Sequence, residues 1–174
     1  MERKGLITFK GAPLTLLGPR LIIGDKAPAF TVIDRDMRDV SLKDFDFKGK
    51  SKLISVTPSL DTPVCDMQAR SFNERAAKMP DEVVVMNISM DLPFAINRFC
   101  ATAGIDRIKT FSDYRHAYFG MSYGVMIKEL RLLARSVFVI DSADIIKYIE
   151  IVPEITDNVD FDRALDEAKK TMNR

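Results

Sequence analysis

Short apolar runs rich in β-branched residues alternate along this chain with segments whose apolar residues recur at helical spacing. The runs predict strands, because valine and isoleucine favour sheets, and the spaced segments predict helices with one buried stripe. This alternation predicts an α/β fold, a central mixed sheet flanked by helices. The predicted strands are 30–33, 52–57, 83–88, 136–140 and 145–152, and the predicted helices are 63–79, a segment that Asp91 caps and Gly104 ends, and 161–172.

A single domain is expected over residues 1–174, because no repeat, low-complexity tract or long linker divides the sequence. Leu6–Phe9 and Pro13–Leu17, which flank Lys10-Gly11-Ala12, are predicted to form a β-hairpin that Gly18-Pro19 closes after its second strand. This hairpin is expected to be an extension, residues 1–20, ahead of the core.

The charge balance argues against a nucleic-acid partner. Lys and Arg total 26 against 25 for Asp and Glu, and a net charge of +1 gives no field that would attract phosphate backbones or anionic lipid. The first apolar stretch ends at Lys10, short of the roughly 7–15 residues of a signal sequence, and no segment approaches the roughly 18 apolar residues of a membrane span. A cytoplasmic protein without membrane contact is expected.

Nucleotide and metal sites have no support in the sequence. No Gly-x-Gly-x-x-Gly follows a predicted strand, and the Gly49-Lys50-Ser51 triplet has Asp44 where a phosphate loop needs its first glycine. Two cysteines and one histidine, without a C-x-x-C pair, do not make a zinc site. No metal or cofactor is expected, and His116 is interpreted as a packed or surface side chain.

The two cysteines, Cys65 and Cys100, are the candidates for chemistry. Disulfides in a reducing cytosol are more often transient and catalytic than structural. The alternative is that both are buried and inert, since free cysteine behaves as a small apolar residue.

Cys65 is predicted to lie in the first turn of a helix. Thr62 followed by Pro63 favours a helix start, with Thr62 as N-cap. Unpaired backbone N–H groups and the helix dipole there favour a thiolate, by about 0.3–1 kcal/mol or up to about 2 kcal/mol when partly buried. Asp61 and Asp66 oppose this effect, so a cation must come from elsewhere in the fold.

Arg135 is the candidate for that cation. It is the lone charge beside a predicted buried strand, and charges are rarely buried without a partner. The alternative is an arginine at the mouth of a strand that extends into solvent. Thr62 likewise has an alternative as an ordinary N-cap without function.

The pattern Pro58-x-x-x-Thr62-x-x-Cys65 resembles the active-site motif of the peroxiredoxins, and residues 24–30 resemble the segment that opens their core domain. Residues 59–65, 90–94 leading into 98–100, and 133–135 are similar to the thiol peroxidase group of atypical two-cysteine peroxiredoxins. The N-terminal hairpin fits that group, and the resemblance covers nearly the whole chain. Ile96 and Ser136 depart from residues common in the family, and neither is expected to touch the reacting atoms.

The resemblance implies a thioredoxin-like fold and an antioxidant peroxidase that reduces hydrogen peroxide and organic hydroperoxides. It implies that Cys65 is the peroxidatic cysteine and Cys100 the resolving one, joined in an intramolecular disulfide that thioredoxin reduces. It further implies that Thr62 and Arg135 orient the thiolate and the peroxide oxygens, that Pro58 shields the pocket from water, and that the protein is a homodimer.

Two cysteines on separate helices are expected to have Cα atoms beyond the roughly 7 Å that a disulfide allows. One or both helix ends must then unwind when the disulfide forms. Two other functions stay open. A thiol–disulfide oxidoreductase on the same fold is disfavoured by the absence of C-x-x-C, and an interaction module without chemistry would not need Pro58, Thr62, Cys65 and Arg135 together.

Overall fold

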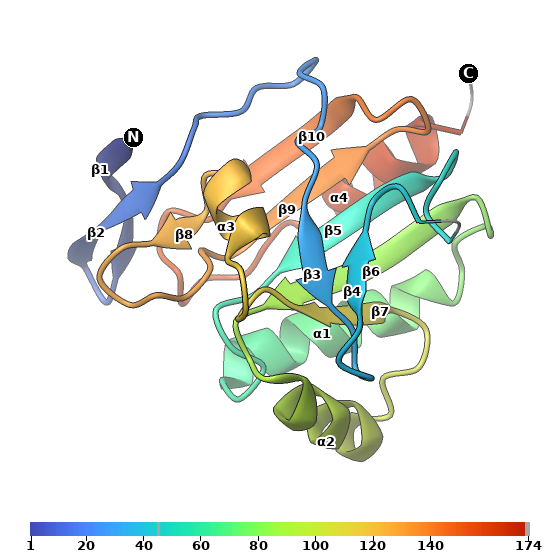
Figure 1. Cartoon of the computed structure of the whole chain (residues 1–174), viewed down its shortest axis with the longest axis horizontal. Helices are drawn as coiled ribbons and strands as arrows, with labels where there is room; N and C mark the ends of the chain where they lie inside the picture. Colours follow the sequence, from blue (N-terminus) through green and yellow to red (C-terminus); the bar gives the residue numbers. More distant parts are fainter. Residues whose placement is uncertain (45, 173–174) are drawn as a thin grey trace.

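A seven-stranded mixed sheet forms the centre of the protein (Figure 1). The computed structural model describes residues 1–44 and 46–172. The strands, in spatial order, are β10 (Ile146–Ile151), β9 (Ser136–Ile140), β5 (Ser51–Val56), β6 (Val83–Ser89), β7 (Lys109–Ser112), β3 (Thr31–Ile33) and β4 (Asp39–Ser41). β5, β6 and β7 are parallel, and the outer pairs are antiparallel. The predicted α/β fold with a mixed central sheet is confirmed.

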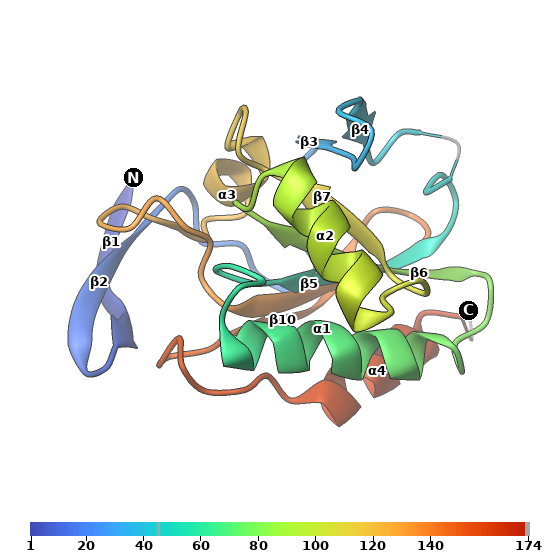
Figure 2. The ribbon, with the colours of Figure 1, turned by 90° about the horizontal axis from the view of Figure 1, so that it is seen from below.

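Three helices cover one face of this sheet: α1 (Pro63–Ala76), α2 (Pro93–Ala103) and α4 (Phe161–Lys170). Their apolar side chains share one core cluster with Leu53 of β5, Val85 of β6 and Val137 of β9. The rings of Phe72 and Phe161 meet at 5.1 Å and join α1 to α4. Figure 2 shows α1 and α4 on one side of the sheet and the short helix α3 (Tyr118–Ser122) on the other.

The N-terminal hairpin is confirmed as β1 (Glu2–Phe9) paired with β2 (Ala12–Leu17), and β8 (Met126–Ile127) adds to the free edge of β2. The chain turns at Lys10 and Gly11, within the predicted connection between the two strands, and their φ angles of 50° and 80° are those that a tight two-residue hairpin turn requires. The second strand ends at Leu17, directly before Gly18-Pro19, in agreement with the prediction.

Glycines hold the hairpin sheet against the core. Gly18 and Gly124 have φ angles of 104° and 67°. A side-chain carbon on Gly18 would overlap the carbonyl oxygen of Met121, and one on Gly124 would overlap that of Pro19. The two backbone segments therefore approach so closely that only glycine fits at either position.

The remaining differences are the bounds of predicted elements and four short elements that were not predicted, β4, β7, β8 and α3. The first helix ends at Ala76 instead of residue 79, and β10 starts one residue late. The prediction that Asp91 caps α2 is wrong, because Leu92 is the N-cap and no side chain bonds to it. None of the helices in the described part of the chain is long and apolar enough to span a bilayer.

Candidate active site

The sulfur of Cys65 lies inside the protein at the start of α1. Cys65 has none of its surface exposed, and it is the third residue of the helix. Thr62 is the N-cap, as predicted, and its Oγ1 accepts a hydrogen bond of 3.4 Å from the Cys65 amide. Pro63 at the first helical position has no N–H to leave unpaired.

Arg135, the residue directly before β9, lies beside this sulfur. Its Nη2 is 3.2 Å from Cys65 Sγ, within hydrogen-bonding distance. The side chain is 2% exposed, so it does not extend into solvent. The structure therefore brings a buried positive charge to the cysteine from a segment far away in the sequence.

The guanidinium of Arg135 is held by two further acceptors. Its Nε donates to the carbonyl of Ile155 at 2.8 Å, and its Nη1 donates to Gln68 Oε1 at 2.7 Å. Gln68 is one turn beyond Cys65 on α1 and is itself buried. Three acceptors on one planar group leave it a single orientation, because the guanidinium N–H groups form a rigid fork.

A buried polar network continues from Gln68 into the sheet. Gln68 Nε2 donates to Ser55 Oγ at 2.8 Å, and that hydroxyl donates to Asn87 Oδ1 at 3.1 Å. Asn87 Nδ2 in turn donates to Thr57 Oγ1 at 3.2 Å. In the described part of the chain no buried side-chain polar atom lacks a partner, so the network is fully satisfied.

Asp91 fixes the loop between β5 and α1. Its carboxylate accepts from Ser59 Oγ at 2.7 Å, from the Leu60 amide at 2.7 Å and from Ser89 Oγ at 2.9 Å. The carboxylate that was expected to cap α2 thus stabilises the loop that leads to Thr62. Pro58, which is buried, begins this loop.

The Thr62 hydroxyl bonds to backbone groups on both sides of it. It donates to the carbonyl of Ser59 at 3.2 Å and accepts from the Cys65 amide. Of the two expected partners of the sulfur, the structure brings Arg135 within hydrogen-bonding distance, whereas the described bonds of Thr62 go to the backbone.

Of the two carboxylates that flank the cysteine, one is paired. Asp66 Oδ1 lies 2.6 Å from Arg70 Nε, one turn along α1. This pair offsets part of the repulsion that Asp66 exerts on an anionic sulfur. Asp61 is exposed, where water screens its charge.

Cys100 is the second buried cysteine, on the inner face of α2. Its sulfur is 3.6 Å from Thr110 Oγ1 of β7, and it belongs to the same core cluster as Phe72 and Ile96. Both cysteines are free thiols in this structure. A bond between them therefore requires at least one sulfur to leave its present partners.

Two side chains of α1 hydrogen-bond to the C-terminal end of α2. Arg70 Nη1 donates to the carbonyl of Ala103 at 3.0 Å, and Asn73 Nδ2 donates to that of Gly104 at 3.3 Å. Asn73 Oδ1 also accepts from the amides of residues 106, 107 and 108. A groove of about 380 Å³ lies between these helices, and its lining includes Thr62, Pro63 and Phe99.

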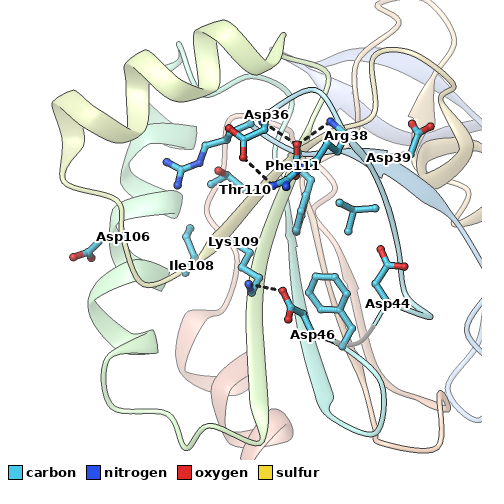
Figure 3. A pocket seen from close by; sticks show the side chains of 14 residues that line it. Asp36, Arg38, Asp39, Asp44, Asp46, Asp106, Ile108, Lys109, Thr110 and Phe111 are labelled. Carbon is cyan, nitrogen blue, oxygen red and sulfur yellow. Dashed lines mark hydrogen bonds and ion pairs between the residues drawn. The ribbon is translucent and has the colours of Figure 1, made fainter.

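Another cleft, rich in carboxylates, lies between the β3–β4 hairpin and β7 (Figure 3). Neither cysteine lines it. Arg38 pairs with Asp34 and Asp36, and Lys109 pairs with Asp46, so three of the six aspartates that line the cleft lie in ion pairs with its cations. Among residues 1–44 and 46–172 no three histidine, cysteine or acidic side chains are grouped as metal ligands.

His116 lies at the surface, in agreement with its interpretation from the sequence. Its ring stacks on Tyr118 at 4.8 Å, and its Nε2 is 3.7 Å from Asp39.

Sequence reasoning missed Gln68, Ser55, Asn87 and Asp91. The only signal for the first three is a polar residue inside an otherwise apolar strand or on the buried stripe of a helix. Such residues need hydrogen-bonding partners when buried, but the sequence does not say which partners they find.

Comparisons with known proteins agree on one family. The family model described as Redoxin matches residues 22–166. A curated protein named "Thiol peroxidase" from Halalkalibacterium halodurans is 54% identical over 166 residues, which covers 95% of this chain and 98% of that protein. Another protein with this name, from Staphylococcus aureus (strain MRSA252), is 55% identical over 159 residues, 91% of this chain and 94% of that protein.

Solved structures show the same relationship. A "peroxiredoxin-like protein from Aquifex aeolicus" superposes with a TM-score of 0.89 at 38% identity, over 97% of each chain. A "Thiol peroxidase from Chromobacterium violaceum" has a TM-score of 0.82 at 22% identity, over 96% of this chain and 97% of that one, which supports the fold alone.

Proposed function

The chain belongs to the Redoxin family, and from this premise we propose that it is a thiol peroxidase, an oxidoreductase in which Cys65 attacks hydrogen peroxide or an organic hydroperoxide. The observation that carries the proposal is the 3.2 Å contact between Arg135 Nη2 and Cys65 Sγ inside the protein. Arg135 forms no ion pair with a carboxylate among the described residues, and a guanidinium that instead faces a sulfur suits a reaction in which negative charge moves from sulfur to oxygen.

In the first step the thiolate of Cys65 attacks one peroxide oxygen. A sulfur–oxygen bond forms, the oxygen–oxygen bond breaks, and the electron pair leaves with the second oxygen, which takes a proton and departs as water or an alcohol. Sulfur is oxidised by two electrons to a sulfenic acid. Arg135 hydrogen-bonds the sulfur before the attack and donates to the departing oxygen during it. Gln68 and Ile155 accept hydrogen bonds from the guanidinium and keep it oriented toward the sulfur and the departing oxygen.

Substrate access follows from the surroundings of the sulfur. Cys65 is fully buried and does not line the groove formed by Thr62, Pro63 and Phe99, which lies at the start of its helix. In this proposal the peroxide enters there. Thr62 orients it at the helix terminus, and buried Pro58 keeps water from the reacting sulfur.

In the second step the Cys100 thiol attacks the sulfenic sulfur, so a disulfide forms and water leaves. Because Cys100 is packed against Thr110 and Cys65 against Arg135, both segments must move before the sulfurs meet. The first turn of α1 and the end of α2 are the parts that unwind, since helix ends open most easily. Thioredoxin then reduces the disulfide by thiol exchange.

The remaining features of the proposal follow the family. The chain acts as one domain with the residue 1–20 hairpin as its extension, as a homodimer in the cytoplasm, and without a cofactor.

The test is peroxide-dependent NADPH consumption with thioredoxin and thioredoxin reductase. The wild-type protein should turn over, and Cys65→Ser should not. Cys100→Ser should consume one equivalent of peroxide and then cycle poorly. Equal turnover by Cys65→Ser and wild type would reject Cys65 as the nucleophile, and no turnover by wild type would reject the peroxidase. Reduction of protein disulfides without peroxide turnover would favour a thiol–disulfide oxidoreductase instead.

A further inference from the structure

A pocket of about 610 Å³ lies on the face of the central sheet opposite α1. Its walls are segment 20–23, β10 and the first strand of the hairpin sheet. The floor consists of Leu16, Tyr123 and Phe138, all of which are buried. Neither cysteine lines this pocket, and α1, which carries Cys65, covers the other face.

The mouth of the pocket is apolar. Ile149 and Ile151 project from β10 onto this face, because alternate residues of a strand point to opposite sides. Leu6, Ile22 and Ile23 surround the opening and are 53%, 58% and 61% exposed. Single exposed aliphatic residues are normal on a protein, but three around one concave opening are typical of a ligand site.

Two arginines, Arg3 and Arg20, line the same pocket, and none of its described lining residues is acidic. Arg3 uses its Nε and Nη2 to bond the carbonyls of Gly18 and Gly124, which leaves other N–H groups of its guanidinium available. Neither arginine forms an ion pair with a carboxylate in the described part of the chain.

The two positive charges also act on each other. Burial, and then the charge of Arg20, lower the pKa of Arg3. Holding two like charges at the edge of an apolar hollow is unfavourable, and an anion between them would relieve it. The apolar lining of the pocket suits a hydrocarbon chain, and its two arginines suit an acidic head group. A ligand that joins the two fits both features.

We propose that this pocket binds the monomeric anion of a single-chain fatty acid. The carboxylate bonds to Arg3 and Arg20, because guanidinium groups bind carboxylates in a bidentate fork. The alkyl chain lies against Ile149 and Ile151 and covers the exposed side chains of Leu6, Ile22 and Ile23, which removes them from water. The site binds the ligand without reacting with it, since the reactive sulfur lies beyond the sheet.

The probe is dodecanoate, titrated below its critical micelle concentration by calorimetry against the full-length protein. One saturable site is expected. Arg20 is exposed and has no described hydrogen bond, so Arg20→Glu should fold normally and weaken binding at least about ten-fold. Arg107→Glu, an exposed arginine outside the pocket, is the matched control and should bind like wild type.

Two further ligands distinguish the contribution of the carboxylate head group to binding from that of the alkyl chain. Decanoate, which is two methylenes shorter, should bind about ten-fold more weakly than dodecanoate. Uncharged dodecanol should bind the wild-type protein about as weakly as dodecanoate binds Arg20→Glu. Methyl NMR signals of Ile149 and Ile151 should shift on titration, and those of Ile54 on β5 should shift less.

Three results would overturn the proposal. The first is no saturable binding to wild type. The second is equal weakening by Arg20→Glu and Arg107→Glu. The third is binding to phosphatidylglycerol vesicles without binding to monomeric dodecanoate, which would make this face a lipid-surface contact. Peroxidase turnover is measured separately, so failure here leaves the proposed function standing.

Discussion

Gln68 Oε1 accepts a hydrogen bond of 2.7 Å from Arg135 Nη1, and both side chains are buried. Cys65 and Gln68 stand three residues apart on α1, so the proposed nucleophile and the residue that orients Arg135 lie on the same helix. The orientation of Arg135 is therefore set by the same element that positions the sulfur.

Arg135→Lys should slow the first oxidation of Cys65 by about 100-fold, because a lysine ammonium cannot bond the sulfur, Gln68 and Ile155 in one plane. Stopped-flow fluorescence or competition with a peroxide-consuming reference enzyme measures the rate constant. Arg107→Lys, an exposed arginine of the α2–β7 loop, is the control. An unchanged rate in Arg135→Lys would remove this residue from the mechanism.

Gln68→Met keeps the length of the side chain but removes the oxygen that accepts from Arg135. The oxidation rate should fall about ten-fold, because the guanidinium loses one of the hydrogen bonds that orient it. Gln68→Glu keeps an acceptor but places a carboxylate against the guanidinium and near the sulfur, so it should not recover the rate. Ser55→Ala removes the bond from Gln68 to the sheet and leaves the acceptor of Arg135 in place. An equal loss of rate in Ser55→Ala and Gln68→Met would assign the effect to the Ser55 bond and not to Arg135.

Asn73→Ala should accelerate disulfide formation after Cys65 is oxidised. Asn73 bonds Gly104 and three successive amides beyond α2, so its loss leaves the end of the Cys100 helix easier to open, by about 1–3 kcal/mol. Rapid-quench mass spectrometry follows the sulfenic acid and the disulfide separately. The first oxidation should stay at the wild-type rate. Slower disulfide formation would mean that α2 does not unwind from this end.

Asp113 should make folding stability depend on pH. Burial raises its pKa to about 6, while hydrogen bonds from the Gly120 and Phe119 amides oppose the shift. Because an unfolded aspartate has a pKa of about 3.9, this group favours the folded state below about pH 4. Its contribution is lost as the pH rises through about 6, by at most about 3 kcal/mol.

Urea unfolding of wild type and Asp113→Asn between pH 4 and 7 tests this dependence. The wild-type free energy of unfolding should fall relative to that of the variant as the pH rises. Asp81→Asn, at an exposed position, controls for the loss of one negative charge. Parallel pH curves for wild type and Asp113→Asn would contradict the prediction.

Gly124→Ala and Gly104→Ala form a matched pair, because their φ angles are 67° and 66°. A carbon on Gly104 meets no atom within 4 Å, so only the strain of a left-handed alanine applies, about 1 kcal/mol. A carbon on Gly124 overlaps the Pro19 carbonyl, and the added cost should be about 2 kcal/mol or more. Thermal unfolding measures the stability of both variants. Equal losses of stability would show that the hairpin sheet moves away from the added methyl group at no cost.

The start of α1 is predictable from the sequence because its signals are local: an N-cap threonine, then a proline, then the cysteine. The long apolar strands are predictable for the same reason. Short elements such as β4, β8 and α3 are not, because their few residues carry no periodicity and they form through distant contacts. Asp91 shows the limit most clearly, since an acidic residue before a helix favours a cap. In the folded protein the loop at Ser59 provides better donors.

The sulfur and its guanidinium come from positions 70 residues apart. During synthesis on the ribosome, a chain that has exposed α1 but not yet β9 carries the nucleophile without its charge partner, and the carbonyl of Ile155 follows later still. In the proposed mechanism, Cys65 therefore becomes reactive toward peroxide only after β9 and the segment at Ile155 have joined the fold. A nascent or truncated chain that lacks them should react with peroxide no faster than an ordinary cysteine thiol.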